Sequence, residues 1–222
     1  VGSGAFMKNI DRARELATVL VQLGNDAGVK TSALITDMST PLGLQVGNAL
    51  EVQEAIDVLA GGGPQDVIDI TVQLAREMLR LAGKPDVDVA AALADGRAMD
   101  KWRQMISAQG GNPDAQLPKA KHAHTVVAEE SGHLSKLDAL SVGIASWRLG
   151  AGRERKEDAV QFGAGVELHA QLGDRVEKGQ PLMTLFTDTP EKFERAQEAL
   201  IGSVQYSENK PAERKFILSK VG

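Results

Sequence analysis

The sequence contains no cysteine, and this absence excludes three kinds of chemistry. Without thiols the chain has no disulfide framework, no thiolate metal site and no cysteine nucleophile. It also lacks any apolar run near the ~20 residues that a membrane-spanning helix needs. The first 30 residues lack the basic start and apolar block of a signal peptide. We therefore expect a cytoplasmic protein with no membrane partner.

The sequence has no excess of positive charge. Its 25 Lys and Arg residues stand against 30 Asp and Glu residues, which gives a formal net charge of −5. A chain with this balance lacks the basic footprint of a general nucleic-acid binder, so we expect no nucleic-acid partner. The basic cluster at 153–156 is too short to change that expectation and is typical of a solvated turn.

Familiar catalytic motifs are absent as well, because the chain has no HExxH, no G-x-S-x-G and no Ser-His-Asp order. His122 and His124 are two residues apart, a spacing that puts both imidazoles on one face of a strand and permits metal binding. No third ligand has a suitable spacing. The favoured interpretation is a solvated linker before a strand.

The hydrophobic pattern of the first half predicts an α/β arrangement. Apolar residues at three- and four-residue spacing predict a helix from Ile10 to Leu23, with Asn9 as its N-cap. A short apolar run at 29–36 predicts a buried strand. Further helices are expected up to about Met105, and no strand is expected between 36 and about 125. Helix, loop and apolar strand in this order are typical of an α/β sheet.

The second half has a β pattern, and turn residues at 110–113 mark the change. We therefore predict two domains, a partial α/β domain at 1–112 and an α+β C-terminal domain at 113–222. The segment 173–182 has the glycine and apolar spacing of a barrel-sandwich hybrid, with Gly173 and Gly179 in turns. This pattern leaves open a non-catalytic biotinyl- or lipoyl-like carrier module. The chain has no Met-Lys-Met or Asp-Lys-Ala, however, so it resembles that fold without the modified lysine.

Several longer stretches carry a resemblance to a known family. They are VGSGAFM at 1–7, ELATVLVQLGNDAG at 15–28, ITDMSTPLGLQVGNALEVQEAIDVLAGGGP at 35–64, LGAGRERKED at 149–158 and LGDRVEKGQPL at 172–182. Together they resemble the C-terminal part of the thymidine phosphorylase and pyrimidine-nucleoside phosphorylase family. The resemblance implies the later half of a mixed-sheet α/β domain followed by an α+β C-terminal domain.

The resemblance also implies an activity. Members of the family are pentosyltransferases that cleave a pyrimidine nucleoside by phosphorolysis, with phosphate as co-substrate, to base and (deoxy)ribose 1-phosphate. They are homodimers and use no organic cofactor. The family's Lys-His-Ser-Thr-Gly-Gly phosphate loop does not occur in these 222 residues. We therefore expect a fragment that is inactive alone, with no catalytic residue of its own.

Two sets of site residues follow from the resemblance, residue by residue. Phe6 matches a position that lines the base pocket. Leu42, Gln45 and Glu54 match the ligands of a potassium ion in the pyrimidine-nucleoside type, the first two through their main-chain oxygens. Hard cations prefer such oxygen donors.

Overall fold

A computed structural model describes residues 1–222 as a mixed α/β chain with three small sheets, whose strand pairs are all antiparallel. The helices are α1 (Ile10–Asp26), α2 (Asn48–Leu59), α3 (Gln65–Leu81), α4 (Val89–Ala94), α5 (Arg97–Ala108), α6 (Ala139–Ser146), the π-helix η1 (Trp147–Ala151) and α7 (Lys192–Leu200). The strands are β1 (Ala33–Thr36), β2 (Gln45–Gly47), β3 (His122–Val127), β4 (Gly132–Leu137), β5 (Gly165–Leu168), β6 (Arg175–Val176), β7 (Pro181–Thr187), β8 (Val204–Ser207) and β9 (Ile217–Val221).

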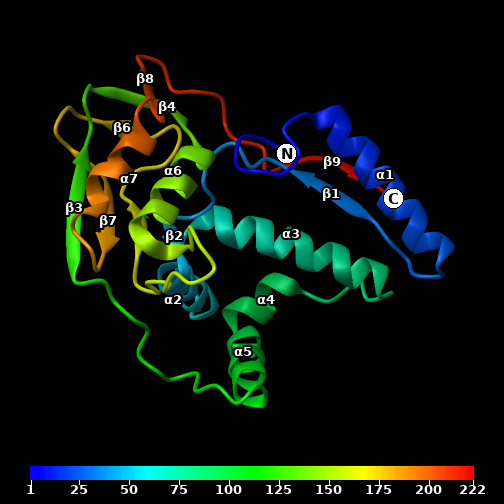
Figure 1. Cartoon of the computed structure of the whole chain (residues 1–222). Coiled ribbons are helices and arrows are strands. Elements are labelled where there is room, and N and C mark those ends of the chain that lie inside the picture. The colour runs from blue at the N-terminus through cyan, green and yellow to red at the C-terminus, as the bar shows by residue number, and fades with distance from the viewer.

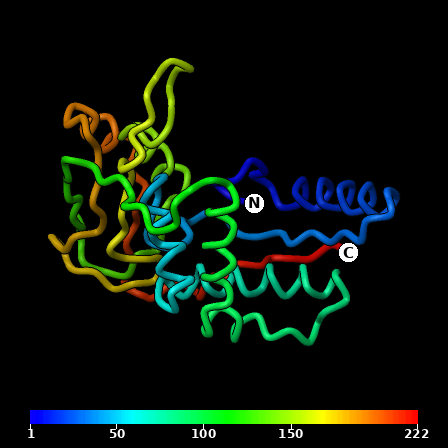
Figure 2. Tube along the Cα trace, turned by 90° about the horizontal axis from the view of Figure 1, so that it is seen from below, coloured from blue at the N-terminus to red at the C-terminus, as the bar shows by residue number.

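The elements gather in two lobes (Figure 1). The sheet lobe contains β2 to β8 with α6 and α7. The open lobe consists of α1, β1, β9 and α3, and its two-stranded sheet lies between the two helices in both views (Figures 1 and 2). The helices α4 and α5 extend below the junction of the lobes.

The continuous hydrophobic core belongs to the sheet lobe. Its 15 buried residues all lie between Ala128 and Ala196. Leu44 and Val46 pack against this cluster from the first half of the chain. The open lobe buries mainly small or isolated side chains, such as Ala17, Val21 and Ile35. The two lobes therefore differ in how well each is stabilised by apolar burial.

The first helix begins where the sequence predicts. The Asn9 side chain accepts hydrogen bonds from the backbone N–H groups of Asp11 at 2.8 Å and Arg12 at 3.2 Å. These two donors have no partner inside the helix, and the cap satisfies them. The helix then buries Ala17 and Val21 against β1 and β9.

One prediction about the strands is wrong. A strand, β2, lies between residues 36 and 125 and pairs with β5 at the edge of a four-stranded sheet ordered β2-β5-β7-β3. It has only three residues, which is too short for a period of two to be recognised. Its pairing with Gly165–Leu168 is decided by contacts far apart in the sequence.

Strand pairing links the two halves of the chain at two places. β2 pairs with β5, and the last strand, β9, returns to pair with β1. Both pairs join residues on either side of position 112. The division into domains at 1–112 and 113–222 stays a prediction.

The segment 173–182 forms β6, a turn and the start of β7. Gly173 has a φ of 93° and Gly179 a φ of 85°, a backbone region that favours glycine. Both glycines therefore occupy turns, as the spacing predicts, while the barrel-sandwich hybrid itself stays a prediction.

None of the helices combines the length and apolar character needed to cross a bilayer.

Candidate functional site

A cavity of about 850 Å³ lies where β1, the loop after it, α2 and α3 meet. Three of the four residues that the resemblance singles out, Leu42, Gln45 and Glu54, line it. Apolar residues of β1 and α3 also line it, including Leu34, Ile70 and Leu74. The cavity therefore combines an apolar wall with a group of oxygen donors.

Glu54 lies on the buried side of α2. Its exposed fraction is 9%, and Oε1 accepts a hydrogen bond of 2.7 Å from the backbone N–H of Leu44. Burial raises the pKa of the Glu54 carboxyl, the Leu44 N–H opposes this shift, and the nearby charges of Asp66 and Glu51 add to it. A cation beside this carboxylate would relieve the cost of burying its charge.

The loop passes very close to this carboxylate at Gly43. Gly43 is buried and has a φ of 69°, and a Cβ at this position would collide with Oε2 of Glu54. Its N–H donates to Oδ2 of Asp66 at 3.0 Å. A glycine is therefore needed for the loop to approach the carboxylate.

The resemblance names two backbone carbonyls as ligands, that of Leu42 in this loop and that of Gln45 at the start of β2. The Leu42 oxygen accepts no hydrogen bond in the structure. The N–H of Leu168 donates to the Leu44 oxygen at 2.7 Å, so Leu44 and Leu168 are a hydrogen-bonded pair of the β2–β5 ladder. Pairs alternate along an antiparallel ladder, and the Gln45 carbonyl consequently points away from β5.

A further oxygen of Gln45 lacks a partner. Oε1 of Gln45 is buried and accepts no hydrogen bond, while Nε2 of the same side chain donates to Glu167 at 3.3 Å. A carboxylate and main-chain carbonyls are oxygen donors of the kind that hard cations prefer. The residue types are therefore compatible with the potassium ion that the resemblance implies.

Arg214 holds the loop in place, and local sequence patterns did not reveal it. Its guanidinium donates to Oδ2 of Asp37 at 2.9 Å and to the carbonyl oxygens of Asp37, Thr40 and Pro41 at 2.8 to 3.0 Å. It also lies 4.7 Å from the ring centroid of Phe216. Arg214 and Asp37 are 177 positions apart, so only the return of the C-terminal segment brings them together.

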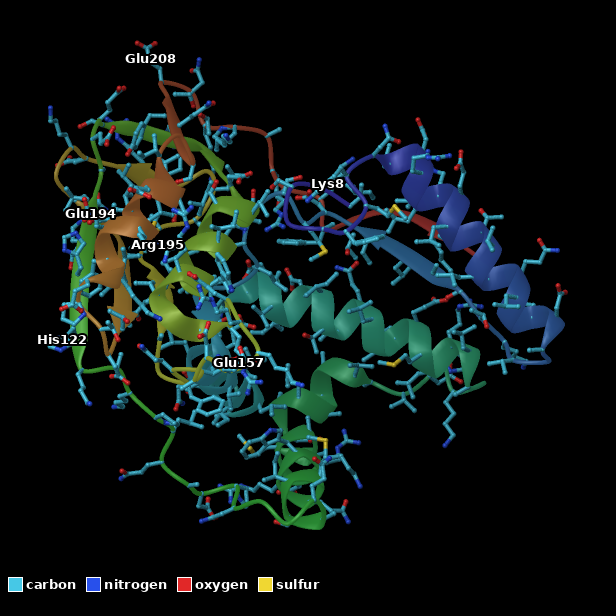
Figure 3. All side chains as sticks on the ribbon, in the orientation of Figure 1. Lys8, His122, Glu157, Glu194, Arg195 and Glu208 are labelled. Carbon is cyan, nitrogen blue, oxygen red and sulfur yellow. The ribbon has the colours of Figure 1, made fainter.

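Phe6 lies apart from these ligands. Its side chain is 94% exposed and does not line the cavity, although Gly4 does. Lys8, labelled in Figure 3, donates to the carbonyl oxygen of Ser3 and closes the loop that presents Phe6. An exposed ring is free to stack on a planar base.

The comparisons with known proteins agree with the sequence motifs. A family model described as the pyrimidine nucleoside phosphorylase C-terminal domain matches residues 133–207. The thymidine phosphorylase of Mycobacterium tuberculosis is 50% identical over 221 residues, which are 100% of this chain and 52% of the relative. The pyrimidine-nucleoside phosphorylase of Bacillus subtilis is 42% identical over 198 residues, 84% of this chain and 46% of the relative.

A third relative gives the same result. The pyrimidine-nucleoside phosphorylase of Staphylococcus epidermidis is 40% identical over 201 residues, 86% of this chain and 46% of its own length. The chain thus spans about half the length of the curated relatives it matches. Residues 133–207 match the pyrimidine nucleoside phosphorylase C-terminal domain, and the chain is similar along its length to about half of a thymidine or pyrimidine-nucleoside phosphorylase.

Proposed function

We propose that the chain contributes the cation-binding half of a pyrimidine nucleoside phosphorylase. The reaction is the reversible phosphorolysis of a pyrimidine nucleoside to the free base and (deoxy)ribose 1-phosphate. The observation that carries the proposal is the convergence of Leu42, Gln45 and Glu54 on one cavity, in a chain whose relatives are named phosphorylases.

The residues of this chain have a positioning role in that reaction. Phosphate attacks C1′ of the sugar while the base departs, so the anion must be held in line with the bond that breaks. Glu54 and the two carbonyls would hold a potassium ion, which supplies positive charge beside the phosphate site. Arg214 fixes the loop that carries the Leu42 carbonyl, and Phe6 would contact the base.

The chain does not contain the phosphate loop of the family, so we propose that it has no phosphorolysis activity alone. We expect activity when the chain is joined to the part of the Mycobacterium tuberculosis relative that it does not match. The measurement is thymine release from thymidine and phosphate, with proteins purified from a host that lacks this enzyme. Turnover by the 222-residue chain alone at the level of the joined protein would contradict the proposal.

The cation site has its own test in the joined protein. We expect Glu54→Gln to raise the potassium concentration needed for half-maximal activity by about tenfold or more, because the variant removes the only charge among the ligands. Asp57→Asn is the matched control, since Asp57 is exposed on the same helix and does not line the cavity. Initial rates are measured against potassium concentration at constant ionic strength. Superimposable curves for the Glu54 variant and the parent would exclude the metal role.

Three further features complete the proposal. The whole protein is a homodimer, which sedimentation of the joined protein would test. The chain divides at 112/113, and its second part has a barrel-sandwich-hybrid-like segment.

The carrier alternative is not favoured, because the relatives are named phosphorylases and no lysine lies in a carrier motif. Mass spectrometry of the purified chain for biotin or lipoate would test that alternative.

A further inference from the structure

The loop between β1 and β2 lies between two cavities. The larger one, described above, is lined by Leu42 and Glu54. A smaller one of about 90 Å³ is lined by Gly43, Asp66 and Gln171. Leu42 and Gly43 are consecutive residues, yet each of them lines only one of the two cavities. The peptide unit that joins them therefore forms part of the wall between the cavities.

Asp66 binds the N–H of this peptide unit. Its Oδ2 accepts a hydrogen bond of 3.0 Å from the N–H of Gly43. Its Oδ1 accepts one of 2.9 Å from the N–H of Val67, in the first turn of α3. A hydrogen bond to a carboxylate is stronger than one between neutral groups. The carboxylate is thus held by its own helix and presents one oxygen to the loop.

Gln171 holds the same oxygen from the second half of the chain. Its Nε2 donates to Oδ2 of Asp66 at 3.1 Å, across a separation of 105 positions. The backbone N–H of Gln171 donates to Oδ2 of Asp174 at 2.8 Å, and this bond holds Gln171 within its own turn. A continuous set of hydrogen bonds therefore runs from Gln171 through Asp66 to the loop at Gly43.

The geometry of a peptide unit converts this contact into an orientation of the Leu42 carbonyl. The C=O of Leu42 and the N–H of Gly43 belong to one planar trans unit, so they point in opposite directions. The N–H points to Asp66, on the side of the smaller cavity, and the carbonyl oxygen consequently points away from that side. No backbone N–H donates to this oxygen. It is one of the two main-chain oxygens that the resemblance assigns to potassium.

This peptide unit needs an acceptor from outside the loop. Gly43 has no Cβ, and glycine adopts positive and negative φ with similar ease, so the unit on its N-terminal side is easy to rotate. Arg214 binds the carbonyl oxygens of Thr40 and Pro41, which precede the unit. Asp66 binds the unit itself and selects one of its orientations.

We propose that Asp66, held by Gln171, is a positioning residue that orients the Leu42 carbonyl toward the cation of the proposed function. It acts through the N–H of Gly43 and touches neither the cation nor the substrate. The proposal rests on the proposed function for the cation. The orientation of the peptide unit rests on the hydrogen bonds alone.

The charge of Asp66 offers a competing explanation that the test must separate. Burial raises the pKa of Glu54, and the nearby charge of Asp66 adds to this shift. Such a charge attracts a cation whether or not the carbonyl is oriented. Asp66→Ala removes both the acceptor and the charge, whereas Asp66→Asn removes the charge and keeps an oxygen acceptor. Comparison of the two variants therefore separates orientation from charge.

The potassium affinity of the joined protein is the main measurement. It is read from the melting midpoint against potassium concentration, with choline keeping the ionic strength constant. We expect Asp66→Ala to weaken the affinity by about tenfold or more, and Asp66→Asn to stay within about twofold of the parent. Asp69→Ala is the matched control, because Asp69 is exposed on the same helix and lines neither cavity.

Two further measurements cover a variant of Asp66 that fails to fold. Gln171→Met keeps the length of the side chain and removes the donor, and we expect it to weaken the potassium affinity as well. In the 222-residue chain without potassium, the Gly43 amide should exchange about tenfold faster in Asp66→Ala and stay slow in Asp66→Asn. The Leu44 amide, which donates to Glu54, is the internal control and should not change.

The outcomes separate this proposal from the proposed function. An Asp66→Asn protein that binds potassium as weakly as Asp66→Ala would assign the effect to charge and overturn the proposal. An Asp66→Ala protein with the affinity of the parent would also overturn it. Both results leave the proposed function intact. A parent protein whose melting midpoint and thymine release do not respond to potassium would count against the cation role itself and overturn this proposal with it.

Discussion

At the scale of the residue, the buried carboxylate of Glu54 is unfavourable for folding and is also the proposed charged ligand of a cation. Its carboxylate is buried next to Asp66 and Glu51, and its N–H partner at Leu44 compensates only in part. A buried carboxylate of this kind destabilises a protein when it is charged and without a cation. The same cost makes it a good ligand, because a bound cation removes the penalty.

The raised pKa of Glu54 predicts how stability changes with pH. The unfolded chain ionises near the ordinary value of 4.5 and the folded chain only at higher pH. Its contribution to stability is therefore present below about pH 4.5 and lost as pH rises through the folded pKa. We expect Glu54→Gln to gain stability relative to the parent between about pH 4 and about pH 7. Urea unfolding at both values, in potassium-free buffer, measures the difference, and a gap that does not change with pH would contradict it.

Arg214 stabilises the same site from the opposite end of the chain. Burial alone would raise the pKa of the Asp37 carboxyl, but hydrogen bonds from Ser39 and the ion pair with Arg214 outweigh it and lower the pKa. The side chains of Arg214 and Asp37 are 13% and 19% exposed. The pair is thus shielded from solvent and held by several additional hydrogen bonds.

We expect Arg214→Met to lower the free energy of unfolding by about 3 kcal/mol, because it leaves a shielded carboxylate and three carbonyls without their donor. Arg12→Met is the control, since Arg12 pairs with Glu15 in solvent, and such pairs contribute about 0–1 kcal/mol. The lowered pKa of Asp37 also predicts that the parent loses stability as pH falls through that pKa, whereas Arg214→Met has less to lose. Denaturant melts across the acid range test both statements.

At the scale of the element, the turn between β6 and β7 depends on Gly179. Gly179 has a φ of 85°, and a Cβ there would have no neighbour within 4 Å, so the cost of a side chain is backbone strain alone. The N–H of Gly179 donates to the oxygen of Ala128 at 2.8 Å, and this bond ties the turn to the end of β3.

We expect Gly179→Ala to lower the free energy of unfolding by about 1–2 kcal/mol, the usual cost of a left-handed residue with a side chain. Lys178→Ala is the matched control, because the Lys178 side chain is exposed and makes no hydrogen bond. Gln180 would be a poor control, since its Oε1 accepts from the N–H of Glu177 at 3.0 Å. Thermal melts of the two variants with equal midpoints would show that the turn does not require its positive φ.

At the scale of the whole molecule, the two lobes differ in how they are held together. One cluster of 15 buried residues joins the helices and strands of the sheet lobe. The open lobe is held together largely by hydrogen bonds and ion pairs, several of which meet at Glu77. Its carboxylate accepts from Ser32, Arg80 and Lys220, and these hydrogen bonds lower its pKa. The Arg80 and Lys220 side chains are 48% and 37% exposed, and ion pairs with such exposed partners contribute little to stability.

This difference predicts unequal opening of the two lobes. An amide hydrogen exchanges when the structure around it opens locally. The free energy of this opening is higher where more buried apolar contacts surround the amide. We expect the amides of β5 and β7 to exchange at least about tenfold more slowly than those in the middle of α1. Native-state hydrogen exchange of the 222-residue chain measures both sets. Equal protection would mean that the open lobe is as stable as the sheet lobe without a partner.

The sequence by itself determined features that depend on neighbouring residues. The Asn9 cap and the helix after it follow from side chains within one turn. The positive φ values at Gly173 and Gly179 follow from turn spacing, and the resemblance to the phosphorylases follows from contiguous motifs such as that at 35–64. In each case the information lies in one contiguous stretch of the chain.

The tertiary structure alone decided what depends on distant residues. The strand β2 exists because β5 pairs with it, and Arg214 reaches Asp37 because β9 returns to β1. The burial of Glu54 and the exposure of Leu20 depend in the same way on what the rest of the chain covers. Neither local propensity nor periodicity encodes such contacts, because they join segments that are separate in the sequence, more than 100 residues apart for β2 with β5 and for Arg214 with Asp37.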